Sequence, residues 1–272
     1  TFKSAAKGDI LVVISGDEGY NVTLVEECYK YSMSQTGWTY NFWKSYLQGD
    51  PTLAELQTFK AVVWQVGAEN YPPFTDAERT LVKNYNNGGG RLWVNSHDVA
   101  WDFGDTGSPD YTVARRDWMR AQLHIDWQVD RSTWATNTGI TGDPISGGYT
   151  GGVAYYPLRG GGAGDEINTY NMPGTETYVW RNPNDDIAVK WVSDLNNGTA
   201  GTGVWGGTPS KVVTYCYEWF QVGANKTVIN AARTDILDLT LRWLLDRDHP
   251  DVTVSAPNGG ETISTATTSI SW

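Results

Sequence analysis

Four residues of this 272-residue chain carry acid–base or nucleophilic side chains and stand at the ends of apolar segments. Ser96 and His97 follow one such segment, and Cys216 and Glu218 end another. A histidine held by a carboxylate can act as a general base, and a hydroxyl or thiol beside it becomes a nucleophile. One alternative is therefore a hydrolase of peptidase or amidase type that uses His97 with Ser96 or Cys216, with Glu218 as a further catalytic candidate.

The same residues also have structural interpretations. A single histidine without a recognisable partner motif is more often bonded to the backbone of its own loop than catalytic. A cysteine on a central strand is more often a buried thiol than a nucleophile. The sequence leaves both interpretations open for His97 and for Cys216.

Carboxylates are frequent directly after His97, and they could bind a metal ion. The aspartates in question are Asp98, Asp102 and Asp105, with Asp110 behind them. Ca²⁺ takes six to eight oxygen ligands from such loops, although the spacing does not match the EF-hand pattern and a solvated acidic loop explains it equally well. No organic cofactor is expected, because the segment 16–19 lacks the glycine spacing of a dinucleotide site and no Gly-Lys-Ser/Thr follows any strand.

Two further groups of residues are candidates for binding a ligand. Asp17, Glu18 and Gln65 follow apolar runs in the first third of the chain. Four tryptophans lie in an irregular middle region, where loops carry function and aromatic faces can stack on sugars: Trp101, Trp134, Trp180 and Trp205. Carbohydrate binding is one hypothesis for these tryptophans, and packing beneath long loops is the structural interpretation.

The elements that position these residues can be inferred from periodicity. Apolar runs without alternation are typical of parallel strands that are covered on both faces. Such runs, separated by helical segments, predict strands at 9–15, 38–43, 61–66 and 91–95. Thr75 and Glu78 have the form of a capping box, which predicts the start of a helix that continues to Tyr85. The pattern predicts an open, mostly parallel sheet with helices on both faces, whose carboxyl edge carries the candidate residues.

The later part of the chain changes in character. From about 101 to 210 the alternation of strand-like and helical segments is lost. This predicts an insertion of short antiparallel strands and long loops, with one helix at 112–123. A strand at 211–216 and an amphipathic helix at 233–245 then return to the sheet domain. We therefore expect a first domain at 1–249.

Composition limits the partners that the chain can have. Twenty basic against 31 acidic residues give a net charge of −11, which disfavours binding to nucleic acid. No apolar stretch has the roughly 20 residues of a membrane span, so no membrane partner is expected. High aromatic and glycine content is typical of secreted proteins, so we expect an extracellular location. Two cysteines leave one disulfide or two free thiols equally open.

The segments 10–16, 59–64, 81–93 and 211–215 resemble the class I glutamine amidotransferase-like superfamily. This flavodoxin-like domain is shared with trehalose-utilisation-type proteins. The superfamily carries a glycine-flanked Cys after its fourth strand and a His-x-Glu pair after a late strand. Here Ser96 stands at the position of that Cys, and no glycine flanks it. In the second motif Glu218 matches the Glu, but a Tyr or Cys stands near the position of the His. Both departures argue against glutamine amidotransferase activity.

The end of the chain resembles a different kind of module. The segment 255–261 reads Ser-Ala-Pro-Asn-Gly-Gly-Glu and is similar to the opening of bacterial extracellular Ig-like repeats. We therefore expect a partial Ig-like module at 250–272. The resemblances together imply a non-catalytic accessory or interaction module of a larger secreted protein, which works with other domains of the same polypeptide and binds a polysaccharide or a protein substrate. The hydrolase is the alternative.

Overall fold

A computed structural model gives the fold of the chain. It describes residues 8–15, 22–67, 72–131, 136–155, 164–170, 175–182, 185–192, 204–205, 208–223, 228–247, 252–254 and 261–263. Within these ranges, no helix combines the length and the apolar character that crossing a membrane requires.

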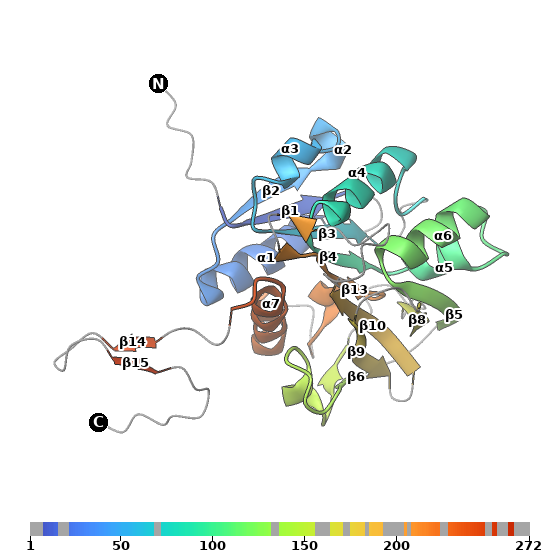
Figure 1. Ribbon diagram of the computed structural model, residues 1–272. Helices are drawn as coiled ribbons and strands as arrows, with labels where there is room; N and C mark the ends of the chain where they lie inside the picture. The colour runs from blue at the N-terminus through green and yellow to red at the C-terminus, as the bar shows by residue number, and fades with distance from the viewer. Residues whose placement is uncertain are drawn as a thin grey trace.

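The centre of the fold is a nine-stranded mixed sheet with the order β2-β1-β3-β4-β13-β10-β9-β6-β7 (Figure 1). Its first five strands are parallel: β2 (Tyr40–Lys44), β1 (Ile10–Ile14), β3 (Ala61–Gly67), β4 (Arg91–Ser96) and β13 (Lys211–Tyr215). Numbered along the chain, this order is 2-1-3-4-5, which is the order of flavodoxin-like sheets. The predicted mostly parallel sheet is therefore confirmed.

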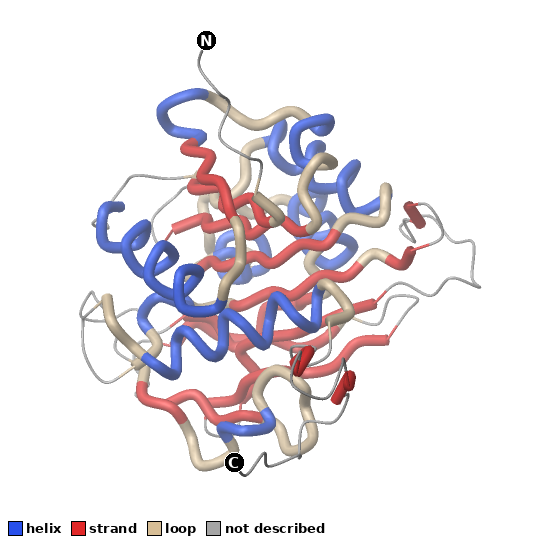
Figure 2. The backbone as a smooth tube through the Cα atoms, turned by 90° about the vertical axis from the view of Figure 1, so that its left-hand side faces the viewer, coloured by secondary structure: helices blue, strands red, loops and turns tan. Residues whose placement is uncertain are grey.

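Helices cover both faces of the parallel strands. The seven helices of the described ranges are α1 (Val22–Thr36), α2 (Ser45–Gln48), α3 (Leu53–Leu56), α4 (Asp76–Asn87), α5 (Val99–Gly104), α6 (Val113–Gln122) and α7 (Ala231–Leu244). Ile10, Val12 and Ile14 of β1 pack in the core on the side of α1 and α7, whereas Leu11 and Val13 pack on the opposite side, with residues of α3 to α6. Figure 2 shows two helices side by side across one face of the strands.

The capping box predicted at Thr75 is present at the start of α4. The Thr75 hydroxyl accepts the backbone N–H of Glu78, and the Glu78 carboxylate accepts the backbone N–H of Thr75. Two backbone donors that the first helical turn leaves without partners are satisfied in this way. The sequence did not indicate the short helices α2 and α5, and α5 follows directly on His97 and Asp98.

The insertion extends the sheet. Its strands β10 (Asp185–Val192), β9 (Thr175–Asn182), β6 (Thr136–Gly139) and β7 (Val153–Ala154) continue the sheet from β13 in antiparallel order. Outside this sheet, β5 (Ile125–Arg131) pairs with β8 (Gly164–Thr169), and β11 (Val204–Trp205) pairs with β12 (Thr208–Pro209). Single 3₁₀ turns occur at η1 (Gly147–Tyr149) and η2 (Trp219–Gln221). The insertion is thus β-rich, as predicted, and shares the core of the domain.

Near the C-terminus, β14 (Val252–Val254) and β15 (Glu261–Ile263) form an antiparallel pair. Both fall within the segment expected to begin an Ig-like module. The Ig-like assignment itself stays a prediction.

Candidate acid–base site at the carboxyl edge of the sheet

The parallel strands bring the candidate residues to one edge of the sheet. Gln65 lies near the end of β3, Ser96 ends β4, and Glu218 follows β13 closely. In open α/β sheets, ligands bind outside the carboxyl ends of the strands, where the strand order reverses. That reversal falls between β1 and β3 here, because the chain leaves β1 for β2 on one side and later returns to β3 on the other.

His97 and Asp98 form a hydrogen-bonded pair directly after β4. The His97 Nδ1 atom lies 2.9 Å from Asp98 Oδ1, and the two side chains are 8% and 21% exposed. A carboxylate that accepts Nδ1–H fixes the imidazole in the tautomer that carries its lone pair on Nε2. This orientation is the one that a general base requires.

Glu218 is fully buried beside this pair. Burial raises the pKa of Glu218 to about 8, against the opposing effects of the His97 charge and of a hydrogen bond from Gln65. The Gln65 Nε2 amide donates that hydrogen bond to Glu218 Oε2. At neutral pH Glu218 is therefore mostly a neutral carboxylic acid, which can donate a proton.

Two carboxyl groups from the insertion complete the surroundings of His97. Asp165 of β8 is fully buried and accepts the backbone N–H groups of Ala100, at 3.0 Å, and Trp101, at 2.8 Å. Burial, followed by the charge of Asp98, raises the pKa of Asp165 well above its usual value. Partial desolvation also raises the pKa of Asp130 on β5, and His97, when it is protonated, lowers the pKa values of Asp130, Asp165 and Glu218 alike. One imidazole therefore interacts electrostatically with carboxyl groups from three segments.

The two nucleophile candidates are both buried. Cys216 is 0% exposed and packs in the apolar core. Burial, followed by the charges of Asp165 and Asp98, raises the pKa of this thiol well above its ordinary value. A thiol that stays protonated at neutral pH is a poor nucleophile, so Cys216 fits its structural interpretation and not the nucleophilic one. Ser96 is 1% exposed at the end of β4.

The acidic loop does not gather into a metal site. Asp102 accepts the Ser108 hydroxyl at 3.1 Å, and Asp105 accepts the Trp101 indole N–H at 3.1 Å. Asp98 pairs with His97 as described above, so the three aspartates have three different partners. Throughout the described part of the chain, no group of three or more His, Cys, Asp or Glu side chains could hold a metal ion.

The predicted ligand-binding residues are scattered. Trp180 is 0% exposed in the core and offers no face to a sugar, which corrects its candidacy as a stacking residue. Trp101 is half-buried in α5 next to the acid–base pair, and Trp205 belongs to β11. Asp17, Glu18 and Trp134 lie outside the described residues.

Sequence reasoning missed three residues of this region. Asp165 follows a glycine-rich run without periodicity, Tyr29 resembles one of the apolar positions of its helix, and Asn95 lies within a strand. Nothing in the local sequence marks any of the three as part of a site. Their proximity to it follows from tertiary pairing, such as the backbone hydrogen bond from Asp165 N–H to Cys216 O, at 3.1 Å.

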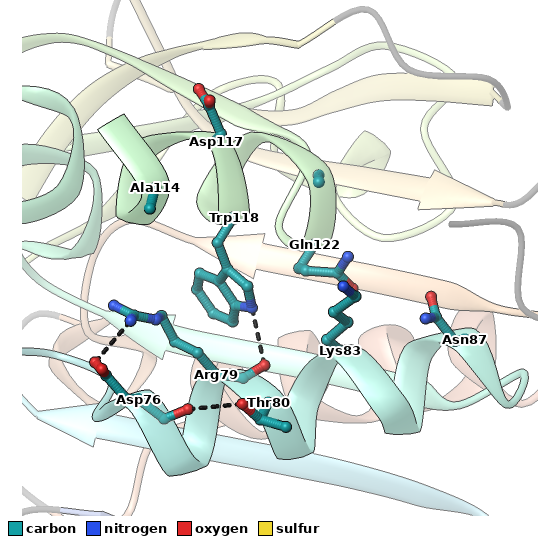
Figure 3. A pocket seen from close by; sticks show the side chains of 10 residues that line it. Asp76, Arg79, Thr80, Lys83, Asn87, Ala114, Asp117, Trp118 and Gln122 are labelled. Carbon is teal, nitrogen blue, oxygen red and sulfur yellow. Dashed lines mark hydrogen bonds and ion pairs between the residues drawn. The ribbon is translucent and has the colours of Figure 1, made fainter. Parts of the chain in front are cut away.

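A separate groove of about 770 Å³ lies between α4 and α6 (Figure 3). Trp118 lies across it and donates its indole N–H to the carbonyl of Arg79, at 2.9 Å, while the Arg79 guanidinium pairs with Asp76 at 2.6 Å. None of the acid–base residues lines this groove.

No family model matches the chain, and no curated protein matches it. Among solved structures, it is similar to a ThuA-like protein from Bacteroides uniformis, with a TM-score of 0.52, 11% identity, and coverage of 90% of this chain and 95% of that one. A ThuA-like protein from Parabacteroides merdae gives a TM-score of 0.45 and 10% identity, with coverage of 95% and 98%. The first of these similarities shows that the chain has the fold of a ThuA-like protein.

Proposed function

We propose that the carboxyl edge of the sheet is a hydrolytic acid–base site for a small polar substrate. His97, held by Asp98, is its general base, and Glu218 is its general acid. The observation that carries this proposal is the presence, at one sheet edge, of an oriented histidine and a carboxyl group that stays protonated at neutral pH. A pair in which one group can accept a proton and the other keeps its proton at neutral pH is typical of acid–base sites.

The proposed reaction needs only these two groups and water. His97 Nε2 takes a proton from a water molecule, and the water oxygen forms a bond to the electrophilic carbon of the substrate. The bond to the leaving group breaks, and Glu218 gives its proton to that group. The proton on His97 then returns through solvent to Glu218, which restores the starting state. Water is taken as the nucleophile because the Cys216 thiol is buried and protonated and Ser96 is 1% exposed.

A panel of chromogenic substrates tests this proposal: p-nitrophenyl acetate, a p-nitroanilide and a p-nitrophenyl glycoside. We expect turnover of at least one of them, and a loss of about 10²- to 10⁴-fold in kcat in both His97→Ala and Glu218→Gln. Cys216→Ala serves as the control and keeps wild-type turnover. Hydrolysis that survives both substitutions would contradict the proposal, whereas a matching loss in Ser96→Ala would identify Ser96 as the nucleophile instead of water.

A non-catalytic accessory module of a secreted protein is the second candidate. One observation favours it: the half-buried Trp101 lies beside the same pair, and Asp105 fixes its indole. A fixed aromatic ring at a site edge is a suitable surface for a sugar or a protein side chain. This candidate predicts binding of a polysaccharide without turnover.

Affinity electrophoresis in gels that contain a soluble polysaccharide distinguishes the two candidates. If the module only binds, Trp101→Ala removes the retardation, while His97→Ala retains it. Trp118→Ala is the matched control, because Trp118 is half-buried like Trp101 and belongs to the separate groove. Equal retardation of wild type and Trp101→Ala would rule out a binding role for Trp101.

A further inference from the structure

A chain of three hydrogen bonds leads from β4 to Glu218. The Asn95 Nδ2 amide donates to Tyr29 Oη at 3.3 Å, and the Tyr29 hydroxyl donates to Gln65 Oε1 at 2.9 Å. The Gln65 Nε2 amide then donates to Glu218 Oε2. The four side chains come from β4, α1, β3 and the segment after β13. Asn95 and Glu218 are 0% exposed, as is Tyr29, and Gln65 is 2% exposed.

The direction of this chain determines which oxygen of Glu218 carries the proton. Because Asn95 donates to the Tyr29 oxygen, the hydroxyl hydrogen of Tyr29 is directed to the Gln65 carbonyl. Because the Gln65 carbonyl accepts from Tyr29, the NH₂ end of the same amide faces Glu218 Oε2. A proton on Oε2 would meet the N–H of Gln65 head-on, so the proton of the neutral acid is on Oε1.

Glu218 Oε1 is a buried atom without a hydrogen-bond partner among the described residues. A buried O–H donor without a partner is costly, because it loses its hydrogen bonds to water and gains none in return. An acceptor on a ligand would satisfy it. This orphaned atom is an observation independent of the three hydrogen bonds.

We propose that Tyr29 and Gln65 are positioning residues that keep the proton of Glu218 on Oε1, available for donation to a ligand. The inference rests on the proposed acid–base function and specifies the direction of proton transfer within it. It also specifies a feature of the ligand: an acceptor atom, such as the oxygen or nitrogen of a leaving group, at Glu218 Oε1.

The opposite arrangement makes the inference testable. If each of the three hydrogen bonds ran in the opposite direction, Glu218 would donate its proton from Oε2 to the Gln65 carbonyl. It would then have no proton to offer a ligand. In the proposed direction Gln65 stabilises the charged form of Glu218, and in the reversed direction it stabilises the neutral form. Loss of Gln65 therefore shifts the pKa of Glu218 upward in the first case and downward in the second.

The other groups that act on Glu218 do not change in this comparison. His97 and Asp98 face it from the loop after β4, and Tyr29 faces it from α1. All three are present in the variant Gln65→Leu. The sign of the shift consequently reports on the hydrogen bond from Gln65.

The experiment is a pH titration of the carboxyl ¹³C resonance of Glu218 in the full chain, assigned by its absence in Glu218→Gln. In Gln65→Leu we expect a pKa higher than that of wild type by about one pH unit. A lower or unchanged pKa would overturn the inference. Gln122→Leu, which removes a buried glutamine elsewhere, is the matched control and leaves the titration unchanged.

Tyr29→Phe provides a second test that removes only one oxygen atom. Without the hydroxyl, Gln65 can turn its carbonyl toward Glu218 and stabilise the neutral acid, so the pKa of Glu218 again rises. A fall would support the reversed chain. Because the titration needs no turnover, a downward shift refutes the positioning roles while the substrate panel decides the proposed function separately.

Discussion

Glu218 connects the chemistry of the site to the stability of the protein. Its pKa is about 8 in the folded state, raised by burial, and near 4.5 when the chain is unfolded. Between these values the folded state binds more protons than the unfolded state, so this residue makes stability fall as the pH rises from 4.5 to 8. Below pH 4.5 and above pH 8 it contributes no slope.

Glu218→Gln removes that slope. We expect the variant to gain stability relative to wild type as the pH rises, by about 1.4 kcal/mol for each pH unit between 4.5 and 8. Urea unfolding at pH 5 and at pH 8 measures the difference. A stability difference between the two proteins that is the same at both pH values would show that Glu218 ionises normally in the folded state.

His124 is a buried histidine with the opposite sign of pH dependence. It adopts a φ of 59° and stacks on the Trp191 ring with centroids 3.8 Å apart. Burial lowers the pKa of His124 to about 3. The unfolded state binds a proton below pH 6.5 that the folded state does not, so stability falls as the pH decreases from 6.5 toward 3.

The imidazole resonances of the chain test this assignment, because it has only three histidines. We expect the His124 signals, assigned in His124→Gln, to keep the chemical shifts of a neutral ring from pH 8 to pH 4. The folded state persists over the range if the aromatic resonances stay dispersed. A titration midpoint near 6.5 for His124 would contradict its burial as a neutral ring.

At the scale of the element, the capping box of α4 illustrates what local sequence determines. The Thr75 hydroxyl satisfies a backbone donor that would otherwise lack a partner in the first turn. We expect Thr75→Ala to lower the free energy of unfolding by about 1 kcal/mol. The control is Thr80→Ala, one turn later on the exposed side of the same helix. Equal effects of the two substitutions in urea unfolding would argue against a specific capping role.

The elements that could be predicted are those with a local signal. Continuous apolar runs marked the strands, and the topology of parallel strands then placed Gln65, Ser96, His97 and Glu218 at one edge. Strands β9 and β10 were not individually predictable, because their apolar residues alternate with charged and polar ones and their partners, β13, β6 and each other, are set by tertiary pairing. Asp165 joins the site through the pairing of β8 with β5, which no local pattern of the sequence encodes.

At the scale of the whole molecule, the described residues form two apolar cores on opposite faces of one sheet. The core on the side of α1 and α7 contains Cys28, and the core on the other side contains Cys216. Both thiols are free and buried, which resolves the alternative between a disulfide and two separate thiols. The insertion contributes to both cores, with Val179 and Trp180 in the first and Ile167 in the second. The two faces should therefore unfold together.

The thiols report on the two faces separately. Cys28 is 1% exposed and accepts a hydrogen bond from Arg233 Nη1 at 3.1 Å, and Cys216 is 0% exposed. We expect neither to react with a thiol reagent such as dithionitrobenzoate in the native protein, because burial excludes the reagent and raises both pKa values. In increasing urea, Cys28→Ala and Cys216→Ala each leave one reporter. If one sheet with a shared insertion unites the faces, each thiol becomes reactive at the same urea concentration as the loss of circular dichroism in its own variant. Reactivity of Cys216 well before that loss would instead show that the face formed by α3 to α6 opens by itself.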